Sequence, residues 1–378
     1  MTSYKYQLIF FGDDNHTFQE IRETIKTRLD DLGVDISTFI FYYNEEAEKY
    51  CGNQPSYVIF SNLEKDYSDK IQSLLFNQIS EGNAILPLYK DDFTIEVHRD
   101  LSKYNGEKRC DINSVVNHIH EGFDLLRRKR RIIISYKRSE TTVIAWQLYQ
   151  YFESRNFDVF LDTHTVPRGY EFQKQLWHSM TDSDIVILLD SPDFLSSTWC
   201  KEELAEAINS HITILRVIFP ETPDYKGYTD LIYPFKLRKE NFNKFDILSE
   251  ETLSNLLKET ESLRARSLAS RQDCLITELI ESAKNNGKTV IRASHNYLLY
   301  IKKDGESIVF IPTIGVPVSR DFETTEFRAL RNSHKTAYVI YDDQSILSEW
   351  LKHIRWLNEQ LRVKGLQRTE FNKWFKDN

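Results

Sequence analysis

Two adjacent glutamates, Glu202 and Glu203, stand in the stretch SSTWCKEELAEAI, residues 196–208, where the spacing of apolar residues predicts a helix. Ser197 or Thr198 can cap this helix, and acidic side chains in a first turn interact favourably with the positive end of the helix dipole. Helix chemistry alone therefore accounts for both acids. A carboxylate that stabilises positive charge on a bound molecule is the alternative.

The helical repeat gives the two glutamates different environments. At about 100° per residue, Leu204 and Ile208 share the face that packs on the core, so Glu202 points nearly opposite, into solvent. Glu203 lies at the boundary of the apolar face, with Trp199 one turn earlier on nearly the same side. The two acids cannot act as paired carboxylates on one bond, and Glu203 alone is a candidate for a site.

Short apolar runs alternate with amphipathic helices around this stretch, which is typical of a mostly parallel sheet. The strands are expected at RIIISY (131–136), FDVFLD (157–162), DIVILLDS (184–191) and ITILRVIF (212–219). Ligands of such sheets collect at the carboxyl ends of the strands, where the helix of Glu203 begins. The following segment YPFKLRKENFNKFDI (233–247) is expected to be irregular, and Ser249 is a plausible cap of the next helix.

Three domains are expected, at residues 1–125, 129–265 and 266–378. The first repeats the alternation of strands and helices. The third begins with a helix at CLITELIESAKNNG (274–287), and Asp304-Gly305 predicts a β-hairpin turn.

Composition excludes several classes of protein. A net charge of −8 argues against generic nucleic-acid binding, and the basic run RRKRR (127–131) is interpreted as the solvated lead-in to a strand. The 4 cysteines show no metal-ligand spacing, which suits a reducing compartment. We see neither a signal peptide nor an apolar run long enough for a membrane span, and expect a cytoplasmic protein with no membrane association.

Three motifs in the middle domain resemble a Toll/interleukin receptor (TIR) domain of the prokaryotic immune NADase type. They are IIISYKRSE (132–140), FDVFLDTHTVPRGYEF (157–172) and SDIVILLDSPDFLSSTWCKEEL (183–204). The resemblance implies a central flavodoxin-like parallel-sheet TIR domain. The patterns of the outer domains add an N-terminal α/β domain and a C-terminal α+β domain, so the expected fold class is α/β. Nothing in the flanking domains carries a resemblance.

The same resemblance implies a reaction, the cleavage of the nicotinamide–ribose bond of NAD⁺, with Glu203 as the catalytic residue. NAD⁺ is then substrate, and neither a cofactor nor a metal is expected. The residues expected to bind it are Ser135, Tyr136, Lys137, Arg138, Phe160, Arg168, Ser191 and Trp199. Lys137 and Arg138 are suited to the diphosphate, and Phe160 or Trp199 to the flat rings. Simpler roles stay open for these residues. Glu203 can serve only the helix dipole, Trp199 can be a packing residue, and Lys137 and Arg138 can be solvated surface residues. Ser135 can form a hydrogen bond within its own turn.

Three functions fit these observations. The first is an NAD⁺ glycohydrolase that is active after TIR–TIR assembly into a homo-oligomer in antiviral defence. An unidentified partner or signal would act on the N- or C-terminal domain. The second is a non-catalytic TIR adaptor that associates with itself, and the third is a receptor for a nucleotide signal in a flanking domain. The Trp-Cys-x-x-Glu arrangement favours the enzyme, because a pure adaptor does not need it.

Overall fold

The computed structural model describes residues 5–31, 35–50, 56–61, 68–80, 83–123, 125–127, 130–161, 172–194, 205, 207–208, 210–223, 231–294, 297–331, 334 and 336–378. The chain divides into two compact units, Met1–Arg128 and Lys129–Asn378. No helix among these residues is long and apolar enough to cross a membrane.

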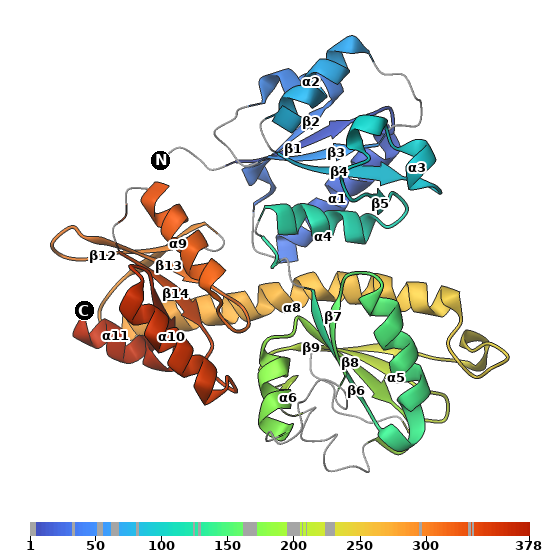
Figure 1. Ribbon diagram of the computed structural model, residues 1–378. Helices are drawn as coiled ribbons and strands as arrows, with labels where there is room; N and C mark the ends of the chain where they lie inside the picture. Colours follow the sequence, from blue (N-terminus) through green and yellow to red (C-terminus); the bar gives the residue numbers. More distant parts are fainter. Residues whose placement is uncertain are drawn as a thin grey trace. The chain divides into compact units, whose positions relative to one another are not determined.

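The first unit is a parallel sheet with helices on both faces (Figure 1). Its strands follow the order β2-β1-β3-β4-β5, which is the flavodoxin-like order. The strands are β1 (Tyr6–Phe11), β2 (Phe39–Tyr43), β3 (Ser56–Phe60), β4 (Ala84–Tyr89) and β5 (Glu107–Lys108). The helices are α1 (Asn15–Asp31), α2 (Asp69–Ser80), α3 (Phe93–Glu96) and α4 (Ile112–Gly122). The expected N-terminal α/β fold is confirmed.

The middle domain, at the start of the second unit, contains a sheet with the same strand order. All its strands are parallel, in the order β10-β9-β8-β6-β7. They are β6 (Arg131–Tyr136), β7 (Asp158–Leu161), β8 (Ile185–Asp190), β9 (Thr213–Ile218) and β10 (Ile232–Lys236). The four apolar runs therefore form the expected strands. The segment expected to be irregular contributes part of β10, in which Pro234 is tolerated because the strand lies at the sheet edge.

Side chains alternate between the two faces of this sheet. Ile132, Ile134 and Tyr136 pack with α5 (Arg138–Glu153) and with the first half of α8 (Glu250–Asn285). Ile133 and the alternate residues of β8 and β9 pack on the other side, with α6 (Phe172–Thr181). We refer to this second side as the α6 face.

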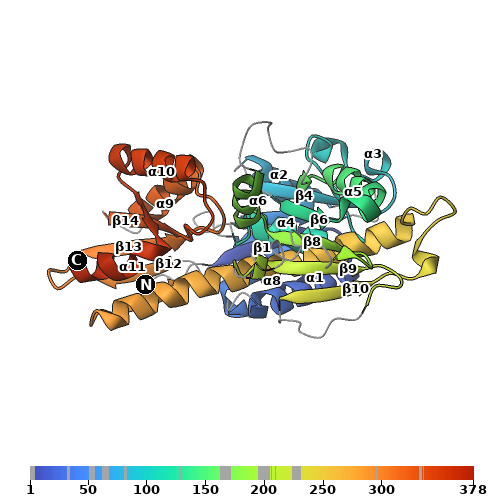
Figure 2. The same ribbon diagram turned by 90° about the horizontal axis from the view of Figure 1, so that it is seen from below.

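The helix α8 is continuous through position 265/266, although the sequence analysis divided it there. It has no glycine or proline from 250 to 285, so nothing in the sequence breaks it. Its 36 residues extend about 54 Å. The hydroxyl of Ser249 accepts a hydrogen bond from Thr252 N, which confirms the expected cap. Figure 2 shows α8 running from the middle sheet to the last sheet.

The C-terminal lobe, residues 266–378, combines a hairpin with parallel strands. Strands β11–β13 pair antiparallel, and β13–β15 pair parallel. They are β11 (Val290–Ser294), β12 (Tyr297–Ile301), β13 (Ser307–Pro312), β14 (Thr336–Tyr341) and β15 (Lys364–Gln367). Helices α9 (Ser319–Arg331) and α10 (Ser348–Gln360) cover one face, and α8 and α11 (Phe371–Asp377) cover the other. Gly305, with φ +88°, makes the expected hairpin turn.

Buried ion pairs join α8 to the middle sheet. Arg264 Nε donates to Asp184 Oδ2 at 2.6 Å, and both side chains have no exposed surface. Arg130 Nη1 lies 2.6 Å from Glu261 Oε1, with side chains 6% and 1% exposed. The interpretation of the basic run as solvated is therefore wrong for Arg130, because α8 supplies its carboxylate from 131 positions later in the chain.

Candidate functional site

Ser135 and Tyr136 end β6 at the carboxyl edge of the middle sheet but point to opposite faces. Tyr136 is buried in the cluster under α5 and α8, whereas Ser135 shares the α6 face with Ile133. Phe160, on the neighbouring strand β7, is half-buried and packs against the apolar cluster of the α6 face. Ser135 and Phe160 therefore lie on the same side of the sheet, and Tyr136 does not.

Lys137 belongs to a small network of polar groups after β6. Its Nζ lies 2.6 Å from Glu140 Oε1 and donates to the carbonyl oxygen of Asp193 at 3.1 Å. Asp193 N donates to Glu140 Oε2 at 3.3 Å. Partial burial raises the pKa of Glu140, but hydrogen bonds from Lys137, Ser191 and Asp193 outweigh this and hold the pKa below its usual value. The charge of Lys137 is thus matched inside the protein, while Arg138, the next residue, is exposed.

Asp190, the residue before Ser191, forms an ion pair with Arg216 that the sequence did not lead us to expect. Arg216, on β9, places Nε 2.7 Å and Nη2 2.5 Å from Asp190 Oδ2 at the end of β8. Asp190 is 1% exposed and Arg216 5%. Burial raises the pKa of Asp190 more than the guanidinium lowers it. The sequence did contain a signal for this pair, because Asp190 and Arg216 are the charged residues of two otherwise apolar strands.

Of the stretch 196–208, the structure describes residues 205, 207 and 208, and all three are helical. Ala207 is fully buried against Leu188, Phe194 and Ile212 on the α6 face, and Ile208 packs partly against the same cluster. The expected packing of Ile208 is confirmed.

Three of the predicted site residues lie outside the described residues: Arg168, Trp199 and Glu203. Glu202 and the loop at 163–170 lie outside them as well. Their roles stay predictions. The described part of the site is therefore the edge formed by Ser135, Phe160, Ser191 and the 137–140 turn.

The middle domain also contacts the C-terminal lobe directly. Leu347 N donates to His178 Nδ1 at 3.4 Å, and the rings of His178 and Trp350 stack with centroids 6.0 Å apart. Val316 N donates to Asp182 Oδ1 at 3.0 Å. These contacts hold the end of α6 and the loop after it against the lobe.

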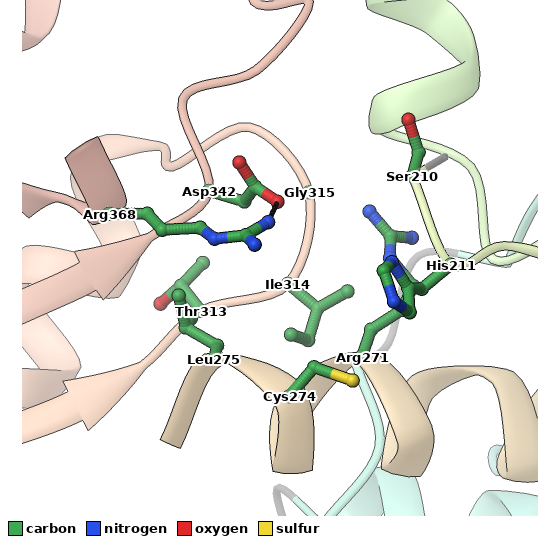
Figure 3. A pocket seen from close by; sticks show the side chains of 10 residues that line it. All are labelled: Ser210, His211, Arg271, Cys274, Leu275, Thr313, Ile314, Gly315, Asp342 and Arg368. Carbon is green, nitrogen blue, oxygen red and sulfur yellow. Dashed lines mark hydrogen bonds and ion pairs between the residues drawn. The ribbon is translucent and has the colours of Figure 1, made fainter. Parts of the chain in front are cut away.

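A narrow cleft lies beside this contact, between the middle domain, α8 and the carboxyl ends of β13–β15. Figure 3 shows His211 next to Arg271, and Arg368 directed at Asp342, to which it is bonded at 2.7 Å. Arg271 donates to the carbonyl oxygens of Ser183 and Thr181. The cavity volume is only about 20 Å³, enough for one water molecule. The cleft is therefore part of the contact between the middle domain and the C-terminal lobe, and not a ligand pocket.

A larger cavity of about 380 Å³ lies within the C-terminal lobe, which is in the range of small-molecule sites. Glu326 and Leu330 of α9, His334, and Arg362 after α10 contribute to its lining. His334 Nδ1 is 2.6 Å from Ser307 Oγ. This cavity is separate from the edge of the middle sheet.

Comparison with known proteins covers the middle of the chain. A family model described as the TIR domain matches residues 132–253. A solved structure, "Structure of the activated Roq1 resistosome directly recognizing the pathogen effector XopQ (TIR domains)", shares 21% identity over 24% of this chain and 58% of that chain, with a TM-score of 0.24. The chain spans little more than half of that structure's chain. The family model agrees with the strand order and the motifs, and residues 132–253 are a TIR domain.

Proposed function

We propose that the TIR domain is an NAD⁺ glycohydrolase that releases nicotinamide. The burial of Ala207 on the α6 face is the observation that carries the proposal. It puts residues 207 and 208, which follow the Trp-Cys-x-x-Glu motif in the sequence, against the sheet face of Ser135. By sequence, Glu203 precedes Ala207 by one helical turn, so its carboxylate is expected near the edge where ligands of such sheets bind.

The reaction breaks the bond from ribose C1′ to the pyridinium nitrogen. Both bonding electrons go to nicotinamide, which leaves as a neutral molecule, so no strong general acid is needed. Positive charge develops on the ribose, as in glycoside cleavage, and the carboxylate of Glu203 stabilises it. Water adds to C1′ and loses a proton, which gives ADP-ribose; capture by an atom of the adenine gives a cyclic isomer instead.

The remaining binding roles follow from the described geometry. Arg138 is exposed at the first turn of α5 and is a candidate for the diphosphate, as is Lys137, which is also paired with Glu140. Phe160 offers a half-buried ring on the α6 face. Trp199 and Arg168 keep the roles that the sequence analysis gave them.

Activity is proposed to depend on assembly of a homo-oligomer through TIR–TIR contacts, as part of antiviral defence. A partner or signal acting on the N-terminal unit or on the C-terminal lobe would trigger it. The cavity beside His334 and Arg362 is a candidate place for a small-molecule signal.

The test is to incubate the full-length protein with NAD⁺ over a range of protein concentrations and to separate the products by chromatography. We expect nicotinamide, with either ADP-ribose or a cyclic isomer, at a rate per molecule that rises with concentration. Protein that is shown to be assembled but leaves NAD⁺ intact would contradict the proposal.

The second candidate is a non-catalytic adaptor that associates through the same domain. The observation in its favour is that Lys137 forms ion pairs with Glu140 and Asp193. These carboxylates neutralise the positive charge that the sequence analysis assigned to binding the diphosphate. An adaptor assembles equally well with Glu203 replaced by glutamine and releases no nicotinamide in either form. Light scattering and chromatography on the same samples distinguish the two functions.

A further inference from the structure

The carboxyl end of β8 contains buried polar atoms whose hydrogen-bonding capacity is unused. Both guanidinium nitrogens of Arg216 that approach Asp190 converge on Oδ2, and Oδ1 has no hydrogen-bond partner within the described parts of the chain. The hydroxyl of Ser191, the next residue, is buried and lacks a well-aligned hydrogen bond there too, although it helps to lower the pKa of Glu140. Two such neighbours require an explanation, because buried polar groups are normally paired.

Asp190 lies on the sheet face that the proposed active site uses. The side chains of β8 alternate, and Val186 and Leu188 belong to the cluster on the α6 face, so Asp190 lies on that face as well. Ser135 of the neighbouring strand pairs with Leu188 and shares the face. The orphaned oxygen thus lies at the carboxyl edge of the α6 face.

The chemistry of the pair limits what it can bind. Arg216 already compensates the negative charge of Asp190, so no cation is needed, and what Oδ1 lacks is a neutral N–H or O–H donor. A hydrated diphosphate does not suit a buried position on the sheet face that carries this apolar cluster. A hydroxyl such as that of Ser191 can donate as well as accept.

A flat apolar ring with a primary carboxamide offers this combination, since its NH₂ group donates beside a carbonyl oxygen that accepts. We propose that Asp190 Oδ1 and Ser191 Oγ bind the carboxamide of the nicotinamide in NAD⁺, with Arg216 as the positioning residue of Asp190. The proposal rests on the proposed function and assigns the part of the substrate that these residues recognise.

This contact makes a specific prediction about substrate choice. Nicotinic acid adenine dinucleotide has a carboxylate where NAD⁺ has the carboxamide, and that carboxylate would repel Asp190. The parent protein should therefore prefer NAD⁺. In Asp190→Asn an NH₂ group can take the place of Oδ1 and donate to the acid, so the preference should fall.

The experiment compares kcat/KM for the two dinucleotides in the parent, in Asp190→Asn and in Ser191→Ala. We expect the ratio in favour of NAD⁺ to fall at least about tenfold in Asp190→Asn, the order of one hydrogen bond to a charged group. Ser191→Ala keeps every charge, and should reduce the ratio less but measurably. Glu203→Gln is the matched control, which should slow both reactions and leave the ratio unchanged.

A second readout covers the case in which Asp190→Asn folds poorly because Arg216 loses its partner. Product inhibition of the parent by nicotinamide should exceed that by nicotinate, and Ser191→Ala should reduce the difference. An unchanged ratio in Ser191→Ala and in folded Asp190→Asn would overturn the carboxamide site while leaving the glycohydrolase intact. A parent that cleaves neither dinucleotide would refute the proposed function itself, and this site with it.

Discussion

Replacing Arg264 by methionine should weaken residues 129–378 severely. Arg264 bonds to Asp184 at 2.6 Å with neither side chain exposed, and Asp184 also accepts from Arg131 N at 3.3 Å. The substitution keeps most of the side-chain volume but removes the guanidinium group, so the buried carboxylate of Asp184 loses this ion-pair partner. Removing one member of such a pair costs about 3–5 kcal/mol. For a unit of this size that corresponds to a fall in Tm of roughly 6–20 °C.

The tryptophans allow this unit to be followed by itself. All 6 lie after position 129, at 146, 177, 199, 350, 356 and 374, so tryptophan fluorescence does not report directly on the first unit. Thermal and urea unfolding of the full-length variant, followed at these residues, give the change in Tm and in the free energy of unfolding.

Two further variants separate the charge effect from a general loss of packing. Arg238→Met removes an arginine whose pair with Glu240 is 78% and 70% exposed, and should change the free energy of unfolding by less than about 0.5 kcal/mol. Arg264→Met with Asp184→Asn should recover at least half of the lost stability, because no buried charge loses its partner. A loss below about 1 kcal/mol in Arg264→Met, or no recovery in the double variant, would refute the reasoning.

Two more predictions concern the contact of His178 with the C-terminal lobe and the packing of the first unit. Burial and the nearby Arg131 lower the pKa of His178 from 6.5 to about 4, and the unfolded chain therefore binds a proton first as the pH falls. The Tm of the tryptophan transition should drop between about pH 6.5 and pH 4, and a parent-like drop in His178→Gln would contradict this. Gly122→Ala would drive its methyl group into the Tyr57 ring, at a cost of about 1–3 kcal/mol. Hydrogen exchange in β3 and α4 should accelerate while the tryptophan transition stays unchanged, and unaltered exchange in both elements would count against the clash.

Local patterns in the sequence were sufficient for most elements. The apolar runs at β6, β8 and β9 have no wet face, which is why a buried parallel sheet could be predicted. Asp304-Gly305 and the cap at Ser249 are equally local, because each depends on neighbours within a few residues.

The features that were missed depend on partners far along the chain. Arg130 belongs to a basic run that looks solvated, and only the packing of α8 shows that Glu261 buries it. The pairing of Asp190 with Arg216 requires knowledge that β8 and β9 are neighbours and that both side chains share a face. Strand β10 was missed because Pro234 is acceptable only at a sheet edge, which no local pattern reveals.

The most direct test of the central claim is the rate of nicotinamide release by two matched variants, Glu203→Gln and Glu202→Gln. Each removes one negative charge from the same predicted helix turn, so both affect the helix dipole alike. If the carboxylate of Glu203 stabilises the ribose cation, Glu203→Gln should lose at least about a hundredfold in kcat, as for removal of one electrostatic contact to a transition state. Glu202→Gln should stay within a factor of about three of the parent. Equal rates in the two variants would contradict the account.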